Sequence, residues 1–167
     1  FMVNWATASG GTDVKVDVGD NTYNANTINI KGESVIDQHA NATGAIAGMY
    51  TSGTNLAKVD SKENVEVKAG GNNATNGNAA NNEVNITAEG LIKQEAESNG
   101  YGGAYVDVSP AAAITKSNIT SNTKAIVTGS WKAKSMNVKA LHDNQVTLDT
   151  DAVKAAVVGL SGVWAFS

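Results

Sequence analysis

The chain has no cysteine and no arginine, and it has a single proline. Without cysteine there is no disulfide and no thiolate ligand for a metal ion. The same absence suits a polypeptide that crosses an outer membrane unfolded, because a disulfide formed during export would obstruct its passage. Every basic residue is a lysine and the formal net charge is −4. The basic face and guanidinium groups of nucleic-acid readers are therefore missing, and we expect no nucleic-acid partner.

Long apolar runs are also missing. No stretch approaches the roughly 18 apolar residues that a transmembrane helix requires, so we expect no membrane span. The chain does not open with a signal peptide, and strand-like patterns run up to both Phe1 and Ser167. We interpret both ends as cuts, which makes residues 1–167 a single segment of a longer repetitive protein.

Leucine and aromatic residues are scarce, and small or β-branched side chains supply most of the hydrophobic content. Valine and isoleucine suit strands, where their restricted χ1 angle costs little. Val14, Val16 and Val18 alternate with Lys15 and Asp17. Such a period of two predicts strands with one buried and one wet face. Asparagine and glycine fill the segments between these patterns, as they do in turns, so we predict an all-β chain.

The sequence repeats itself every 50–60 residues, and this repeat is the main guide to its fold. Ile28–Ile30 matches Val84–Ile86 at an offset of 56, and the same offset carries Ala40 to Ala96. Any one of these matches is weak in a chain so rich in alanine, but together they indicate a real unit.

Two further matches support the repeat. Residues 14–16 match residues 65–67 as Val-x-Val. The pattern Ala-x3-Gly-x2-Gly-x-aromatic occurs at 96–105 and again at 155–164, an offset of 59, and residues 40–50 show it with one residue inserted. Variable loops between conserved strand patterns would explain the differing offsets.

Three architectures combine many short strands with a long repeat: a sandwich, a propeller and a solenoid. A sandwich does not need a repeat, and three blades would not close a propeller. A solenoid accepts any number of units, because each coil contacts only its neighbours. We therefore predict a parallel β-helix with coils of roughly 18–22 residues, about three to each repeat unit and roughly eight in the chain.

Residues that could carry chemistry are scattered. His39 and His142 each stand alone beside an acidic residue or a glutamine, whereas a metal site needs further ligands close by, and we expect both to be exposed. The same expectation of solvated charge covers four aspartates: Asp17, Asp20, Asp107 and Asp149. The sequence contains no phosphate-binding loop and no nucleophile elbow. We predict no catalytic residue, no cofactor and no metal site.

Two other sets of residues recur. Asn-x-Ser/Thr sequons begin at Asn41, Asn73, Asn85 and Asn118. Composition alone explains them in a chain so rich in asparagine and threonine, so we do not infer glycans from them. The aromatic residues of the repeat are Tyr50, Tyr105 and Trp164. We expect them to pack at a corner beside the repeated glycine, while exposed rings could instead stack on sugars or receptors.

A family resemblance rests on three features: the Ala-x3-Gly-x2-Gly-x-aromatic pattern, the stretch Val84–Ala88 and the stretch Ser117–Ser121. Together they resemble the haemagglutinin-like exoproteins of two-partner secretion, and in particular the leukotoxin-type filamentous adhesins of anaerobic bacteria. The resemblance runs over the whole chain. It implies a right-handed parallel β-helix fibre, export through an outer-membrane transporter, and a role in adhesion or cytotoxicity as an extracellular protein of the bacterial cell surface.

Three functions follow as hypotheses. The first is a structural shaft of a secreted adhesin or filament, with a host-cell surface or glycan as a possible partner and no enzymatic activity. The second is a lyase or hydrolase that acts on polysaccharides, since parallel β-helices also carry such enzymes; the lack of arginine and of clustered carboxylates counts against it. The third is a filament subunit that polymerises by end-to-end self-association.

Overall fold

The computed structural model describes residues 2–22, 25–49, 52–72, 81–107, 111–159 and 163–166. Within these ranges the chain is all-β, as predicted, and contains no helix, hence none able to cross a membrane. The strands are β1 (Met2–Asn21), β2 (Thr27–Gly48), β3 (Gly53–Asn72), β4 (Asn81–Asp107), β5 (Ala111–Ser130), β6 (Ala133–Gly159) and β7 (Val163–Phe166).

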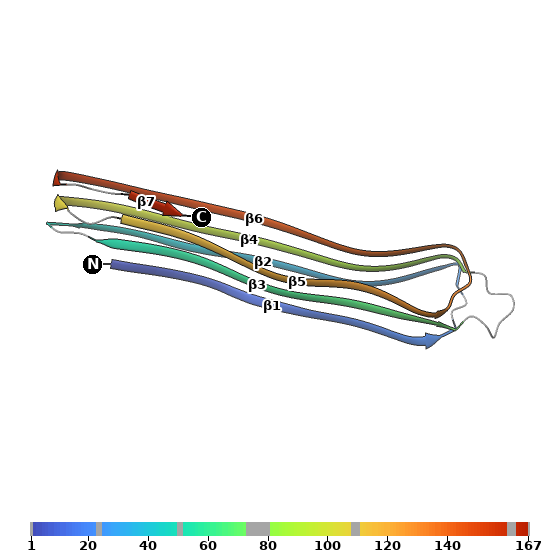
Figure 1. The fold of residues 1–167 in the computed structure, drawn as a ribbon. Helices are drawn as coiled ribbons and strands as arrows, with labels where there is room; N and C mark the ends of the chain where they lie inside the picture. Colours follow the sequence, from blue (N-terminus) through green and yellow to red (C-terminus); the bar gives the residue numbers. More distant parts are fainter. Residues whose placement is uncertain are drawn as a thin grey trace.

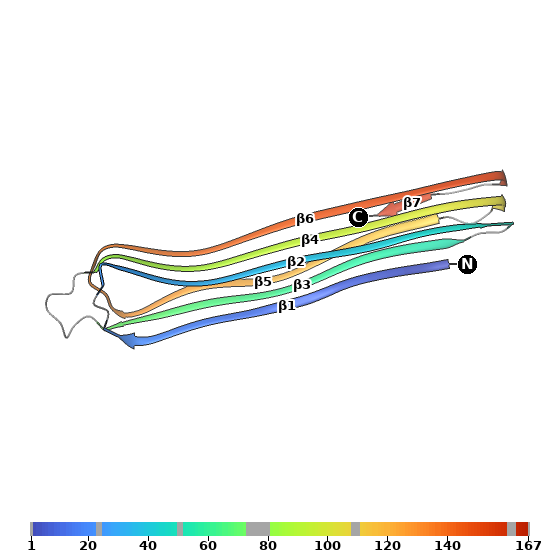
Figure 2. The ribbon, with the colours of Figure 1, turned by 180° about the vertical axis from the view of Figure 1, so that it is seen from behind.

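The strands form two sheets of parallel strands. One sheet has the order β1-β3-β5-β7 and the other the order β2-β4-β6. The chain therefore passes along one sheet, crosses to the other, returns, and then pairs with the strand two before it. Figures 1 and 2 show β1 to β6 lying side by side along the length of the molecule, with the short β7 near one end. The arrangement is consistent with a β-helix-like solenoid.

Two of the repeat alignments are confirmed as strand registers. Ile28 pairs with Val84 and Ala40 with Ala96, at the predicted offset of 56. The Val-x-Val match is also a register, because Val14 pairs with Val65. Residues that recur in the sequence therefore lie directly above one another in the sheets.

The third alignment is wrong. β4 and β6 pair at an offset of 52, so that Ala96 lies beside Leu148, whereas the predicted offset of 59 would have placed it beside Ala155. The two offsets differ by an odd number of residues, and an odd shift turns every side chain to the opposite face of the sheet. Ala96 is buried and Ala155 is exposed, so burial decides against the glycine and alanine matches.

The prediction of roughly eight short coils is also wrong. The long strands β1 to β6 each contain 20 to 27 residues, and one repeat unit makes a single pass through both sheets. The predicted coils were too short because residues typical of turns lie inside strands. Asp143 and Asn144 fall in the middle of β6, and Gly10 and Gly11 fall in the middle of β1. Strands of this length exceed the usual 3–10 residues.

Burial alternates with period two along the strands, and it is deepest in the middle of the stack. β2 shows the pattern over nearly its full length, and Val59, Val65 and Val67 of β3 and Val84 of β4 are completely buried. One apolar cluster lies near the β1–β2 turn and includes Ile30, Val67 and Ile86. A second contains Ala40, Ala42, Ala57, Val59 and Ala96.

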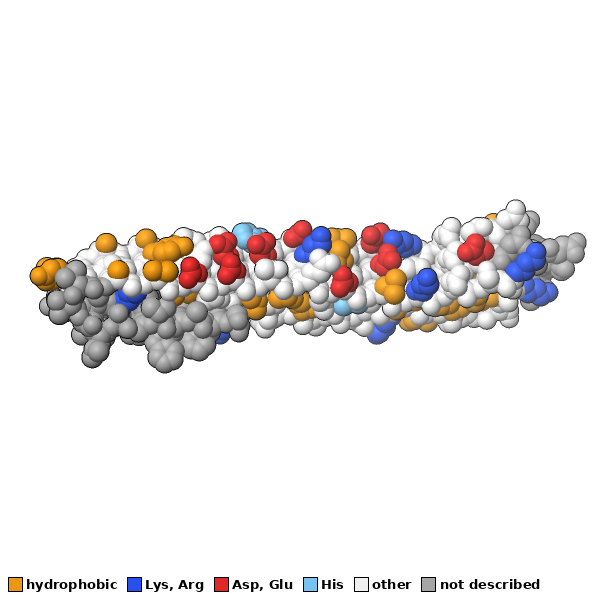
Figure 3. Space-filling model, turned by 90° about the horizontal axis from the view of Figure 1, so that it is seen from above, with side chains coloured by type: hydrophobic (Ala, Val, Ile, Leu, Met, Phe, Trp, Pro, Cys, Tyr) orange, Lys and Arg blue, Asp and Glu red, His pale blue; other side chains and the backbone are white. Residues whose placement is uncertain are grey.

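The first and last coils are covered on one side only. The inward side chains of β5 and β6 are half-buried or exposed over most of their length. Figure 3, which views the molecule from the β6 side, shows hydrophobic side chains in a row along this uncovered end. β7 begins to cover it, because Val163–Phe166 pairs with Ala111–Ile114.

Coil length can be tested by cross-linking, and the absence of native cysteine makes the experiment clean. Lys15 and Glu66 are register partners on neighbouring strands, within the Cα separation that a disulfide tolerates. The double variant Lys15→Cys/Glu66→Cys should therefore cross-link rapidly under mild oxidation, as judged by mass spectrometry of the digest. The pair Lys15→Cys/Asp37→Cys is the matched control. A coil of 22 residues would join that pair, and efficient cross-linking there would contradict the long-coil fold.

The inward and outward faces can be tested by truncation. Ile86→Ala removes a fully buried side chain and should lower the free energy of unfolding by about 2–5 kcal/mol. Ile126→Ala deletes the same atoms from a residue on an outer face and should cost less than about 1 kcal/mol. Urea unfolding followed by circular dichroism measures both values, and equal losses would refute the assigned register.

Candidate functional site

A polar layer separates the two apolar clusters inside the core. The amide oxygen of Gln38 on β2 accepts from the backbone N–H of Gly10, and its amide nitrogen donates to the hydroxyl of Ser61 on β3. Gln94 on β4 donates to the same hydroxyl at 2.5 Å, and it accepts from the hydroxyl of Ser117 on β5. The chain of hydrogen bonds runs from sheet to sheet and from coil to coil, so buried polar side chains hold neighbouring coils in register.

The next inward position along β3 carries a buried carboxylate. Glu63 is only 1% exposed. Its Oε2 atom lies 3.0 Å from Nδ1 of His142 on β6, the distance of an ion pair. Within the described residues neither carboxylate oxygen accepts a hydrogen bond of good geometry. A charge in such a place is stable only when it is paired, so the imidazole is the contact on which Glu63 depends.

Glycine makes room for this pair. Gly90 on β4 lies between Ser34 and His142 in the inward ladder. A Cβ atom at Gly90 would overlap the Glu63 carboxylate and would lie 2.7 Å from Nδ1 of His142. Glu63 therefore passes beside Gly90 to reach the following coil, and any larger residue at this position would displace it.

The chemistry open to the Glu63–His142 pair is limited by what lies at the far side of the imidazole. In acyl-transfer triads the carboxylate holds one ring nitrogen and the other activates a hydroxyl. Here Nε2 of His142 lies 2.7 Å from the amide oxygen of Asn144. The hydroxyl of Thr123 is 3.4 Å from Nδ1, the nitrogen that already faces Glu63. The described residues around the pair thus provide no nucleophile at Nε2, and the geometry is that of a contact between coils.

The expected exposure of the histidines is confirmed for one and wrong for the other. His39 points outward, half-exposed, with Nε2 at 4.0 Å from Glu95. His142 points into the core. The offset of 52 predicts this inward direction. It pairs His142 with Gly90, and Gly90 faces the core because it lies an even number of residues from the buried Ile86.

The aspartates named from the sequence behave as predicted where their side chains are described. Asp17, Asp20 and Asp149 are exposed, and the side chain of Asp107 lies outside the described residues. Among the described residues no three acidic or histidine side chains converge on a point that could hold a metal ion.

The sequon asparagines take part in ladders on the outer faces. Asn85 donates to Asn29 at 2.9 Å, and Asn137 donates to Asn85 at the same distance. Asn118 donates to Asp60 and Asn41 to Glu97, each at 2.7 Å. Stacked amides of this kind stabilise cross-β structures. Asn73 lies outside the described residues.

The prediction that the repeated aromatic residues pack at a corner is wrong for Tyr105, the one of the three whose side chain the structure describes. Tyr105 is 60% exposed on the outer side of β4, and Trp164 belongs to β7, in the other sheet. Tyr50 lies outside the described residues. Tyr105 and Trp164 match in the sequence at an offset of 59, but that offset is not a strand register of the structure.

Ion pairs lie on the outer faces, both within one strand and between neighbouring coils. Lys31 contacts Glu89 at 2.5 Å and Glu33 at 3.0 Å. Its hydrogen bond to Glu89, and to a smaller extent the one to Glu33, raises the pKa of Lys31. These two carboxylates help to line a hollow of about 440 Å³ on the β2-β4-β6 sheet, together with Asp143. A saccharide-cleaving site would need two carboxyl groups free to act on opposite sides of a glycosidic bond, whereas Glu33 and Glu89 are both held by one lysine.

The other sheet has a similar pair. Lys58 lies 2.6 Å from Asp60, and this contact, followed by the hydrogen bond from Asn118, lowers the pKa of Asp60.

Comparison of the chain with protein-family models, with curated proteins and with solved structures found no match.

The contribution of the buried pair can be measured with a double-mutant cycle. His142→Leu leaves the Glu63 carboxylate buried without a partner and should lower the free energy of unfolding by about 3–5 kcal/mol. Glu63→Leu/His142→Leu removes both polar groups and should restore most of that loss. Urea unfolding of the two single variants and the double variant gives the coupling. If the losses of the single variants simply add in the double variant, the pair does not interact.

Proposed function

We propose that the chain is a segment of the shaft of a secreted bacterial surface filament or adhesin, wound as a right-handed parallel β-helix. The observation that carries the proposal is the stacking of like residues in successive coils, exemplified by the ladder of Asn29, Asn85 and Asn137. In such a ladder each coil is a template for the next, so the architecture has no natural stopping point. A right-handed path is expected because connections between parallel strands of one sheet are right-handed in nearly all proteins.

The role is structural rather than catalytic. Glu63 is buried, and His142, which also lines the surface hollow, lies between Glu63 and the amide of Asn144. Of the carboxylates that line the hollow, Glu33 and Glu89 are held by Lys31, and Asp143 accepts a hydrogen bond from Gln145. What the chain offers to other molecules is two long outer faces rather than a cleft. Adhesion to a host-cell surface or glycan, export through an outer-membrane transporter and an extracellular location all belong to this proposal.

Location tests the proposal most directly. Antibodies raised against the purified chain should label intact cells of the organism that produces it, and electron microscopy should place the label on structures that project from the cell surface. Brief protease treatment of intact cells should remove the signal. Labelling that appears only after the cells are lysed would contradict the proposal.

A parallel assay addresses the enzymatic alternative. Acidic and neutral polysaccharides incubated with the purified chain should keep their viscosity and release no reducing ends. Depolymerisation that is abolished by Glu89→Gln, with Glu66→Gln on the opposite sheet as the matched control, would identify the hollow as an active site and overturn the structural role.

A further inference from the structure

The two outer faces of the molecule carry opposite charge. We define face A as the outward side chains of β1, β3 and β5, and face B as those of β2, β4 and β6. On face A lysines outnumber carboxylates: Lys15, Lys58, Lys62, Lys68, Lys116 and Lys124 against Asp13, Asp17, Asp60 and Glu66. On face B carboxylates dominate: Glu33, Asp37, Glu83, Glu89, Glu95, Glu97, Asp143, Asp149 and Asp151 against Lys31, Lys93 and Lys139. Figure 3 shows acidic side chains gathered along one long margin of the molecule.

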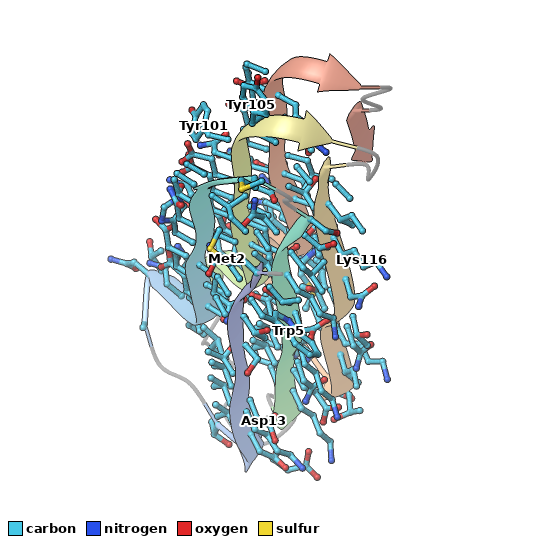
Figure 4. The ribbon with its side chains drawn as sticks, turned by 90° about the vertical axis from the view of Figure 1, so that its left-hand side faces the viewer. Met2, Trp5, Asp13, Tyr101, Tyr105 and Lys116 are labelled. Carbon is cyan, nitrogen blue, oxygen red and sulfur yellow. The ribbon has the colours of Figure 1, made fainter. Side chains whose placement is uncertain are left out.

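Both faces are apolar at the same end. On face A, Trp5 is 70% exposed and is in register with Leu56, which in turn is in register with Ile114. On face B, Tyr101 and Val153 form a register pair and are 44% and 50% exposed. In Figure 4 this end of the molecule faces the viewer, with Tyr101 and Tyr105 on one side and Lys116 pointing away on the other.

A charged band follows the apolar end on each face, and the two bands lie at the same height along the strands. On face A the band is the register pair Lys58 and Lys116, with Asp60 beside them in contact with Lys58. On face B it consists of the neighbouring carboxylates Glu95, Glu97, Asp149 and Asp151. The second apolar cluster fixes their common height, because Ala57 and Val59, which flank Lys58, pack inside the core against Ala40 and Ala42 of β2.

We propose that a second copy of this chain docks by face A onto face B, with the strands of both copies pointing the same way. A translation perpendicular to the sheets that lays β3 over β4 and β5 over β6 brings Leu56 and Ile114 onto Tyr101 and Val153, and it brings Lys116 onto Asp149. Burial of exposed aromatic surface supplies attraction, and the charged bands set the register and exclude the reversed orientation. The contact is heterologous, so each copy keeps one free face of each sign and lateral stacks can grow.

If the chain is part of a shaft, as proposed above, lateral docking would join several shafts into a bundle. The docking itself is argued only from the side chains of faces A and B. It also differs from end-to-end self-association, which would pair the backbone of β6 or β5 with β1 or β2. Lateral docking uses side chains of the outer faces and leaves these strand edges open.

Charge reversal with rescue tests the docking. The wild-type chain should associate in sedimentation velocity at low ionic strength. Lys116→Glu places a carboxylate opposite Asp149, and Asp149→Lys places an ammonium group opposite Lys116, so each variant sets like charges against each other in the docked pair. Each variant alone should associate at least about tenfold more weakly. A mixture of the two variants should regain wild-type association, because the new carboxylate on face A of one variant lies opposite the new ammonium group on face B of the other.

The matched control is Lys124→Glu, which makes the same charge change on the same strand. Lys124 lies at the far end of face A, where the proposed register opposes it to Lys31 and Lys139 of face B and to the carboxylates of Glu33 and Glu89 that contact Lys31. The charges nearly cancel there, so this variant should associate about as tightly as the wild type. A wild-type chain that stays monomeric, or variants whose mixture does not recover, would overturn lateral docking. Small-angle X-ray scattering that still reports an elongated monomer would leave the shaft in place, whereas a compact shape would remove the shaft as well.

Discussion

The structure depends on one constraint: every strand must stay in phase with its neighbours in the sheet. Side chains alternate between the core and the outer face, so a slip by one residue would bury charges such as Glu66 and expose valines such as Val65 and Val67. The pairing of Val14 with Val65 and of Ile28 with Val84 shows the phase being kept over strands of 20 residues or more. In-phase stacking produces the core, the ladders and the two outer faces together.

The polar layer inside the core acts on the same constraint. Aliphatic side chains of similar size allow a strand to slide by two residues without changing face, because alanine and valine fit many positions. A hydrogen-bonded set such as Gln38, Ser61 and Gln94, or a buried pair such as Glu63 and His142, fits only one register, since a slip would leave polar groups buried without partners. We infer that these polar residues help to fix the register in a core built mainly of small aliphatic side chains.

Sequence patterns were sufficient for the strand faces and for two of the three registers, because alternation and repeated hydrophobic side chains are local signals. They failed for the pairing of β4 with β6, where the matched glycines and alanines of 96–105 and 155–164 have the wrong parity. They also failed for coil length, since residues such as Asp143 and Asn144 favour turns locally but continue a strand when neighbouring coils supply hydrogen-bond partners. The contact of His142 with Glu63 joins residues far apart in the sequence, and only the correct register brings it into view.

The length of each coil has a consequence for shape. One coil takes more than fifty residues, as the pairing of Met2 with Gly53 shows, and it advances the stack by a single strand spacing of about 4.8 Å. The same residues laid along the strands span about 65 Å or more in each direction. A molecule that grows by stacking such coils is therefore broad and flat. Each added coil lengthens the stack only slightly and contributes mainly to the area of the two outer faces.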